Sequence, residues 1–284
     1  MASCGGTHLS RFFSLLLLSF TMSSTMGRVL CIITGASRGF GWAVALHMSR
    51  VVKPGSALVL TARSADDLRA LQEELTTSEA GRAGLKAVIV PADLGEKEGP
   101  ERVLKQAGEA FDEDMDHVIL INNAASLGDV SRFIRDFTNM AEVDSYMSFN
   151  VTSFLCLTAG VLQRFPQRPG LKRTVVNVST MAAIQAYPSW VLYCSGKAAR
   201  LMMMRVLAQE EPDLRVLNYS PGPLDTAMLK EALSKTAHSG HKKSILDLLS
   251  EGKLLTCEDS CAQMMKLLLD DKFTSGDHID IFDL

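Results

Sequence analysis

The chain has 284 residues, of which 47% are hydrophobic, enough to bury a sizeable core in one large α/β domain or two small ones. Its formal net charge is −3 and the charges are mixed along the chain, so we expect no nucleic-acid-binding surface. The six cysteines are scattered. Cys257 and Cys261 are four apart, but no second pair completes a metal site, so we expect reduced thiols, mostly in the core.

The first 25 residues are interpreted as a separate leader. Arg11 precedes an apolar run at 12–20 that resembles a short signal-peptide core but is too short for a comfortable membrane span. Three interpretations stay open: an unused upstream start, a signal or anchor, and an ordered extension. We favour the first, because a domain with unpaired thiols fits the cytoplasm and needs no membrane. The chain then divides into a leader at 1–25, disordered or outside the fold, and one domain at 26–284.

Apolar runs rich in β-forming residues alternate with helical patterns along the domain. The first run, at 29–32, leads into a glycine turn at 33–41 and a helix that starts at 42–48. Further strands are predicted at 56–62, 86–91, 117–121, 173–179, 214–219 and 278–282, and helices at 65–78, 96–111, about 144–165, 191–209 and 258–269. The alternation predicts a single-domain Rossmann fold of the α/β class, a doubly wound parallel sheet of about seven strands with helices on both faces. A ligand should lie across the carboxyl ends of the strands.

We expect residues 228–249 to form a mobile, partly helical lid over those strand ends. Its inward-facing apolar side chains should be Leu229, Leu233, Ile245 and Leu248. The polar stretch at 239–243 is predicted to be a loose loop. We interpret His238 and His241 as solvated residues of that loop and not as metal ligands.

The glycine turn has the spacing Gly-x-x-x-Gly-x-Gly between a strand and a helix. Gly35 permits a tight turn, Gly39 lets the backbone approach an anion with no Cβ in the way, and Gly41 lets the helix pack closely on its strand. The free N–H groups at the positive end of the helix would face the anion. The turn therefore predicts a phosphate site, although the spacing alone also fits an ordinary tight turn.

The end of the second predicted strand carries information about the cofactor. A site for NAD often has an acidic residue there, which accepts hydrogen bonds from the ribose hydroxyls. Here the position holds Arg63, and Arg38 in the glycine turn is a second cation within reach. Two cations suit the extra 2′-phosphate of NADP(H), which we predict in preference to two solvated surface arginines.

Tyr193 and Lys197 are four apart on a predicted helix and therefore lie on one face. A free phenol is a weak acid at neutral pH, and a nearby ammonium should lower its pKa. Tyr193 can then protonate a carbonyl oxygen as a hydride arrives at the carbon. Taken alone, the pair also fits a surface cation beside a half-buried ring.

Motifs occur in a fixed order: Thr-Gly-x-x-x-Gly-x-Gly at 34–41, Asn-Asn-Ala at 122–124, a hydroxyl after the fifth strand, Tyr-x-x-x-Lys at 193–197 and Pro-Gly at 221–222. With this set, the chain over 28–284 resembles the short-chain dehydrogenase/reductase family. The resemblance implies an NADP-dependent oxidoreductase. It assigns the cofactor to Gly35, Ala36, Ser37, Arg38, Gly39, Phe40, Gly41, Arg63, Ser64, Asp93, Leu94, Asn123, Lys197, Leu224, Asp225, Thr226, Ala227, Met228 and Leu229.

Further segments resemble the family members that reduce pterin side-chain ketones: 30–41, 91–95, 121–131, 217–226 and 275–283. The catalytic set that this implies is Tyr193 as the acid, Lys197 as its partner at the nicotinamide ribose, Thr180, and Asn150 as support for a proton-relay water. The implied substrate site comprises Thr180, Met181, Tyr193, Gly222 and Asp280. A carboxylate at 280 suits a pterin, because it accepts two hydrogen bonds from the ring. The resemblance also implies a homodimer paired through the long helix and the Tyr193 helix.

Two residues depart from the family pattern. The catalytic serine position, thirteen before Tyr193, holds Thr180, which keeps a hydroxyl donor but adds a methyl and stiffens χ1. Ser179 beside it should point to the opposite side. Ala125 replaces a glycine after Asn-Asn-Ala, and its methyl could perturb the cofactor. We expect activity, with three alternatives left open: a reductase of other carbonyls, a weakly active NADPH-binding sensor, and a reductase tethered by the leader.

Overall fold

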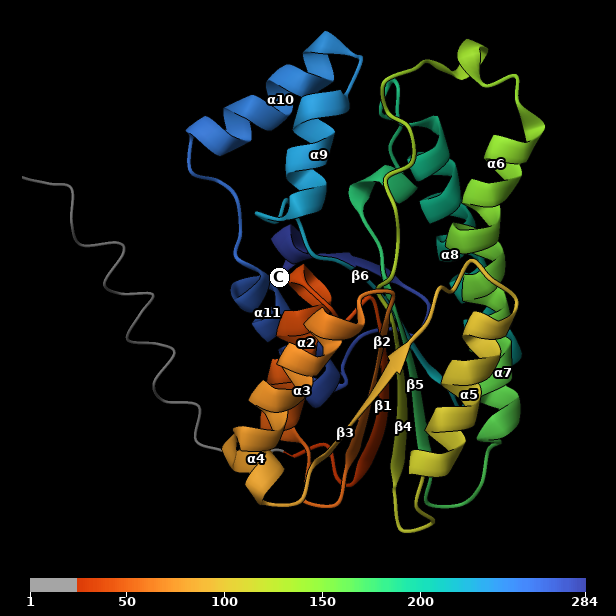
Figure 1. The fold of residues 1–284 in the computed structure, drawn as a ribbon, viewed down its shortest axis with the longest axis vertical. Coiled ribbons are helices and arrows are strands. Elements are labelled where there is room, and N and C mark those ends of the chain that lie inside the picture. Colours follow the sequence, from red (N-terminus) through yellow and green to blue (C-terminus); the bar gives the residue numbers. More distant parts are fainter. Residues whose placement is uncertain (1–24) are drawn as a thin grey trace, which may run out of the picture.

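A parallel β-sheet runs through residues 25–284, the part of the chain that the computed structural model describes (Figure 1). Its strands are β1 Val29–Thr34, β2 Ala57–Ala62, β3 Lys86–Pro91, β4 His117–Asn122, β5 Lys172–Val178, β6 Arg215–Ser220 and β7 His278–Asp280. The order is β3-β2-β1-β4-β5-β6-β7, and each neighbouring pair is parallel. The predicted doubly wound, seven-stranded sheet is confirmed. The predicted leader lies outside the described residues except for its last position, so it stays a prediction.

Helices cover both faces of the sheet (Figure 1). On one face lie α2 Gly39–Val51, α3 Ala65–Thr77 and α11 Cys257–Asp270, and on the other lie α5 Glu98–Ala110, α7 Ser153–Arg164 and α8 Val191–Glu210. The short helix α4 Glu79–Arg82 follows α3, and α6 Met140–Met147 joins α7 through a π-helical turn, η2 Ser148–Thr152. Three 3-10 turns, η1 Ile134–Asp136, η3 Met181–Ala183 and η4 Ile281–Asp283, complete this part.

The central strands are buried on both faces, which explains why they read as continuous apolar runs. On β1, Cys31 and Ile33 pack among the residues of α2 and α11, whereas Leu30 and Ile32 pack with those of α5 and α7. All of them are fully buried. The pleat thus divides one strand between two cores, which fixes the register of the strand.

The predicted long helix begins at Met140, earlier than expected, and it is interrupted by η2. By length and composition, the segment Met140–Arg164 could cross a membrane. Its apolar residues Phe154, Leu157 and Val161 instead pack into the core beside the sheet. This packing identifies it as a core helix of the domain.

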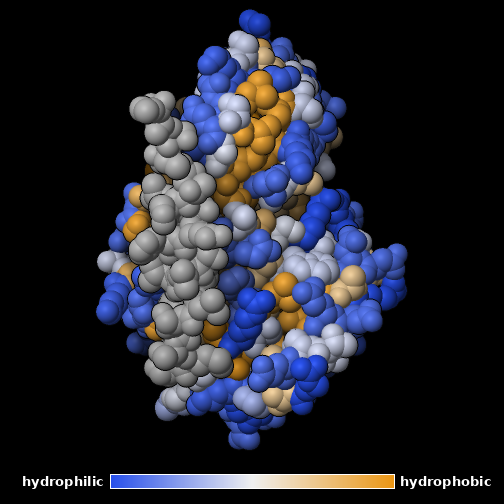
Figure 2. Space-filling view, turned by 90° about the vertical axis from the view of Figure 1, so that its left-hand side faces the viewer, coloured by the Kyte–Doolittle hydropathy of each residue, from blue (hydrophilic) through white to orange (hydrophobic). Residues whose placement is uncertain are grey.

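The lid consists of two helices, α9 Ala227–Lys235 and α10 Ser239–Ser250, which project beyond the carboxyl ends of the strands (Figure 1). The predicted loop at 239–243 is therefore wrong, because His238 caps α10 by accepting a hydrogen bond from the His241 N–H (3.1 Å). The inward apolar set is confirmed: Ile245 is buried, Leu229 and Leu233 pack around it, and Leu248 faces the cleft below. Figure 2 shows apolar surface gathered at this end of the molecule.

The last strand is shorter than predicted and ends at Asp280. The Asp280 side chain accepts a hydrogen bond from the Phe282 N–H (3.1 Å), and this cap turns the chain into η4. The strand expected at 278–282 therefore ends at Asp280, because the carboxylate of this residue bonds to the backbone N–H two residues later.

Candidate active site

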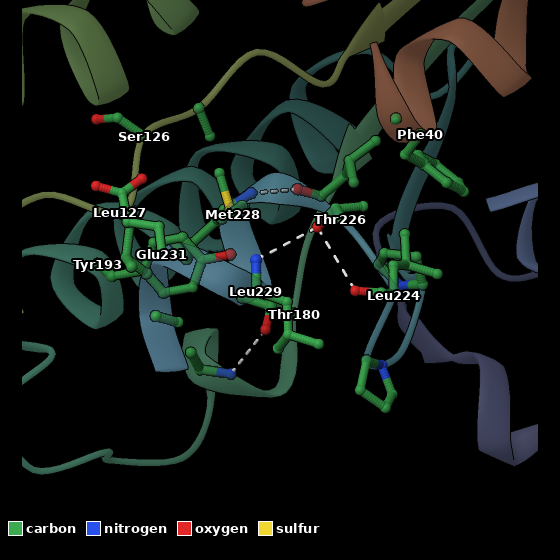
Figure 3. A pocket seen from close by; sticks show the side chains of 18 of the residues that line it. Phe40, Ser126, Leu127, Thr180, Tyr193, Leu224, Thr226, Met228, Leu229 and Glu231 are labelled. Atoms are coloured by element: carbon green, nitrogen blue, oxygen red, sulfur yellow. Dashed lines mark hydrogen bonds between the residues drawn. The ribbon is translucent and has the colours of Figure 1, made fainter. Parts of the chain in front are cut away.

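A cleft of about 1640 Å³ lies across the carboxyl ends of the strands and beneath the lid, where the doubly wound topology predicts a ligand. Figure 3 shows Tyr193, Thr180, Met228 and Leu229 around it. Most predicted site residues line the cleft. The predicted residues that do not line it are Ala36, Gly41, Asp93 and Asn150. Ala36 belongs to the core, and the Asp93 carboxylate accepts a hydrogen bond from the Gly95 N–H (2.9 Å), which closes a local turn.

The glycine turn has the backbone that its spacing predicts. Gly35 and Gly39 have positive φ, +67° and +56°, which favour glycine. Gly41 is needed for a different reason, since a Cβ there would lie 2.2 Å from the Gly35 carbonyl oxygen. A Cβ at Gly39 would meet only a Thr226 methyl carbon, at 3.5 Å. The start of α2 carries no side-chain cap, so its first N–H groups lie free at the cleft.

Asn123 and Thr34 fasten this turn to the end of β4. The Asn123 amide donates to the carbonyls of Thr34 and Gly35 (2.9 and 3.1 Å). The Thr34 hydroxyl accepts from the N–H groups of Asn123 and Ala124 (2.9 and 3.0 Å). Asn123 therefore acts on a cofactor site chiefly by shaping the glycine turn. Thr34 completes this network and was not predicted from the sequence, although it is the last residue of β1 and precedes the first glycine of the turn.

Arg38 and Arg63 are exposed at the mouth of the cleft, near the end of β2. Within residues 25–284, neither forms an ion pair with a carboxylate. Ser64 is the N-cap of α3 and accepts a hydrogen bond from the Asp67 N–H (3.3 Å). Leu94 is buried and lines the cleft. Two unpaired guanidinium groups thus lie at the position that discriminates the two nicotinamide cofactors.

Tyr193 and Lys197 lie on one face of α8 and are buried, with 9% and 5% exposure. The Lys197 ammonium is 5.7 Å from the centre of the Tyr193 ring and donates a hydrogen bond to the Val178 carbonyl (2.7 Å). Burial raises the pKa of Tyr193 to about 12, with Arg200 the main opposing influence and the Thr180 hydroxyl a smaller one. The pKa of Tyr193 is thus raised overall and not lowered as expected, because the effect of burial is the largest. Burial also lowers the pKa of Lys197 well below its usual value.

Thr180 sits where the family serine is expected, at the start of η3. Its hydroxyl accepts a hydrogen bond from the Ala182 N–H (3.2 Å), and Met181 is partly exposed beside it. Ser179 is 2% exposed and its hydroxyl has no protein partner. Ala125 lines the cleft without a positive φ, so an alanine fits there without backbone strain.

Asp280 lies in the wall of the cleft at the end of β7 and is 5% exposed. Its carboxylate accepts hydrogen bonds from the Ser220 hydroxyl and the Phe282 N–H. Gly222 bends the chain next to it with φ +75°, where a Cβ would crowd the Ile281 side chain at 2.9 Å. A surface role for Asp280 is wrong. Ser220, which was not predicted from the sequence, orients it from the last position of β6.

Segment 224–229 closes the cleft from the lid side. Leu224 pairs with Leu255 in an isolated parallel bridge. Thr226 caps α9 by accepting from the Leu229 N–H (3.4 Å), a bond drawn in Figure 3. Asp225, Ala227 and Met228 line the cleft beside them. The predicted lid residues are thus brought together at the start of α9.

Asn150 lies behind the cleft, in η2. Its amide donates to the Ser126 hydroxyl and the Tyr146 carbonyl (2.9 and 3.0 Å) and accepts from the Ser126 N–H (2.8 Å). Its carbonyl oxygen accepts from Arg200. Asn150 therefore holds the chain after β4 in place. Arg200 was not predicted from the sequence, although its spacing of seven from Tyr193 places both on one helix face.

The other reactive groups show no second centre in the described part of the chain. Residues 25–284 contain no group of three His, Cys, Asp or Glu side chains arranged to hold a metal ion. Their cysteines, Cys31, Cys156, Cys194, Cys257 and Cys261, are all free thiols. Cys31 and Cys261 are core residues as expected, whereas Cys156 is exposed.

Comparison with known proteins agrees with a nicotinamide cofactor and an oxidoreductase reaction in this cleft. A sepiapterin reductase from Bos taurus is 47% identical over 262 residues, covering 91% of this chain and 96% of the relative. One from Xenopus laevis is 47% identical over 261 residues, covering 92% and 98%. A benzil reductase from Bacillus subtilis is 28% identical over 257 residues, covering 89% and 98%.

The solved structures and the family model agree with these relatives. The crystal structure of the KRED1-Pglu enzyme matches with a TM-score of 0.73 and 27% identity, covering 89% of this chain and 100% of that chain. The model described as short chain dehydrogenase matches residues 30–237. The resemblance seen in the sequence is confirmed, and with it an oxidoreductase that uses a nicotinamide cofactor. The chain belongs to the short-chain dehydrogenase/reductase family.

Proposed function

We propose that the chain is an NADPH-dependent reductase of pterin side-chain ketones, sepiapterin and 6-pyruvoyl-tetrahydropterin, in tetrahydrobiopterin biosynthesis. The observation that carries this proposal is that a buried phenol, Tyr193, and a buried carboxylate, Asp280, line one cleft. A pterin with a side-chain ketone offers N–H donors to the carboxylate and a carbonyl to the phenol. Two sepiapterin reductases at 47% identity support the same substrate class.

The cleft fits NADPH at its outer end. The uncapped start of α2 and the open approach at Gly39 suit the pyrophosphate, and Arg38 and Arg63 supply positive charge for the 2′-phosphate. When bound there, NADPH supplies the hydride that the carbonyl carbon accepts. Arg63→Asp should raise the KM for NADPH and leave that for NADH unchanged or lower. Equal effects on both cofactors would contradict the assignment of NADP(H).

Tyr193 delivers the proton. With its pKa raised to about 12, it is protonated at neutral pH, so it can donate to the carbonyl oxygen that becomes a hydroxyl. The Thr180 hydroxyl lies at the same place and can hold that oxygen through a hydrogen bond. Lys197 orients the nicotinamide ribose, and Asp280 orients the ring of the substrate.

The test uses the purified protein with NADPH and sepiapterin, followed by loss of the reduced-nicotinamide absorbance. Tyr193→Phe should leave NADPH affinity nearly intact and abolish turnover. NADPH binding without oxidation by the wild type would favour a sensor. Oxidation of NADPH with simple diketones but not with sepiapterin would favour a general carbonyl reductase. The similarity to a benzil reductase, which is named for a diketone, supports that alternative.

We further propose a cytoplasmic homodimer paired through α7 and α8. Leu155 on α7 and Met202 and Val206 on α8 are exposed by 47%, 57% and 44%, although a monomer gains nothing from apolar side chains there. Met202→Glu should convert the dimer to a monomer in sedimentation equilibrium, and an unchanged mass would contradict this interface. Free thiols among residues 25–284 fit a reducing compartment. Mass spectrometry of the native N-terminus and cell fractionation test the location.

A further inference from the structure

Arg200 is the largest of the fully buried side chains, with 2% exposure. In the part of the chain from 25 to 284, no carboxylate lies within ion-pair distance of its guanidinium. Burial lowers its pKa to about 10, so it remains charged at neutral pH. Burying a cation without a counter-ion is unfavourable, even after relaxation of the surroundings. A methionine would fill a similar space without that cost, so packing alone does not explain an arginine here.

The guanidinium bonds to carbonyl oxygens from two different elements. Its Nε donates to Asn150 in η2, and its Nη1 donates to Ala124, in the segment after β4, at 3.0 Å. Its Cζ lies 4.8 Å above the centre of the Phe154 ring on α7, a geometry that stabilises a cation. One planar fork thus joins the end of the sheet to the helix at its π-helical turn, a type of turn that is frequent at functional sites.

These bonds continue to the wall of the cleft. Ala124 lines the cleft, and Asn150 uses its side chain to hold Ser126, which lines it as well. Ala124 also donates its N–H to the Thr34 hydroxyl at the glycine turn (3.0 Å). Arg200 therefore fixes one wall of the cofactor site from behind, without entering the cleft itself.

The same cation acts on the Tyr193 phenol. Tyr193, Lys197 and Arg200 occupy one face of α8. The remaining groups that face this centre are Cys194 on α8 and Tyr146 on α6, together with the hydroxyl of Thr180, the N-cap of η3. None of these groups carries a negative charge at neutral pH. Arg200 opposes the effect of burial on the pKa of Tyr193 more strongly than the Thr180 hydroxyl does.

We propose that Arg200 is a positioning residue of the active centre, which holds the carbonyls of Ala124 and Asn150 in one fork and places a fixed positive charge behind the Tyr193 phenol. Its charge stabilises the phenolate that remains after Tyr193 gives up its proton. This inference rests on the proposed role of Tyr193 as the proton donor.

The experiment measures the pKa of Tyr193 directly. Protein labelled with 3-fluorotyrosine, which is more acidic than tyrosine, gives one fluorine signal for each of the four tyrosines, and Tyr193→Phe identifies the signal of interest. Arg200→Met should raise the pKa of that residue by about one pH unit or more, since an opposite charge nearby has been removed. Arg200→Lys should restore most of the wild-type value, because it keeps the charge.

Arg173 provides a matched control. It is also buried, with 5% exposure, but it lies on β5 away from the cleft and pairs with Glu211 (2.8 Å). Arg173→Met should leave the Tyr193 titration unchanged, even where it lowers stability. If Arg200→Met does not fold, the uncharged Arg200→Gln is compared with Arg200→Lys in its place.

The same Tyr193 pKa in the wild type and in Arg200→Met, or in the Gln and Lys variants, would overturn the proposal, since a purely structural brace would not move that titration. The measurement needs no turnover. If the wild type fails to reduce sepiapterin, the proposed function is wrong, while the fluorine titration still decides the role of Arg200.

Discussion

Asp280→Asn separates recognition of a pterin from reduction of a carbonyl. The two carboxylate oxygens of Asp280 each accept one protein hydrogen bond, from the Ser220 hydroxyl and the Phe282 N–H, and each keeps acceptor capacity for a ligand. Asparagine has nearly the same shape, but one oxygen becomes an NH₂ donor and the charge is lost. Hydrogen bonds to a charged group contribute about 1.5–3 kcal/mol. The change should therefore weaken a pterin by about 10- to 150-fold.

The assay compares kcat/KM for sepiapterin and for a small diketone in the wild type and in Asp280→Asn, with NADPH in excess. The pterin should lose the full factor, mainly through KM, whereas the diketone should change little because it has no ring donors. The KM for NADPH serves as the control for the integrity of the cleft. A loss of the same size for both substrates would refute the reasoning, because Asp280 would then support the fold of the site and not the substrate ring.

Three further changes test other parts of the structure. Thr180→Ser keeps the hydroxyl that bonds to the Ala182 N–H, so kcat/KM should change by less than about 1 kcal/mol, roughly fivefold, and a larger loss would show that the methyl is needed. Gly41→Ala places a Cβ against the Gly35 carbonyl, which should lower the unfolding free energy by about 1–3 kcal/mol and raise the KM for NADPH, so unchanged denaturant curves would contradict the packing. Burial lowers the pKa of His117 from 6.5 to about 4. Between these two values His117 is protonated in the unfolded chain but not in the folded chain, so stability falls as the pH is lowered from 6.5 to about 4. His117→Gln should remove up to about 3 kcal/mol of that loss, and an equally steep dependence of Tm on pH in the variant would contradict it.

The order of elements was predictable because the central strands lie inside two cores. Val29 to Thr34 are buried at every position, so the strand shows as an unbroken apolar run in the sequence. Boundaries were less predictable where a side chain sets them. His238 starts α10 by capping it, and Asp280 ends β7 by bonding to the chain beyond, and neither effect is visible in periodicity. The π-helical turn at Ser148–Thr152 likewise depends on tertiary contacts.

The site was predictable where a motif reports contacts along one element. Tyr193 and Lys197 share a helix face, and the spacing shows it directly. Arg200 lies on the same face, but its meaning depends on carbonyls of Ala124 and Asn150, which are 76 and 50 residues away. A backbone carbonyl is present at every residue, so the pattern of side chains does not indicate which carbonyl accepts a hydrogen bond. Long-range polar contacts of this kind therefore cannot be predicted from the sequence.

The electrostatics of the centre keep the Tyr193 phenol protonated at neutral pH. Burial raises the pKa of Tyr193 and lowers that of Lys197, so both groups resist their charged forms in the dry interior. A phenol in this setting holds its proton at neutral pH and releases it only when a stronger base, the oxygen that gains negative charge during hydride addition, arrives beside it. Arg200 keeps its charge throughout and limits the cost of the phenolate that is left behind. Tyr193 thus holds the proton that carbonyl reduction requires from the protein, as its proposed role as the acid demands.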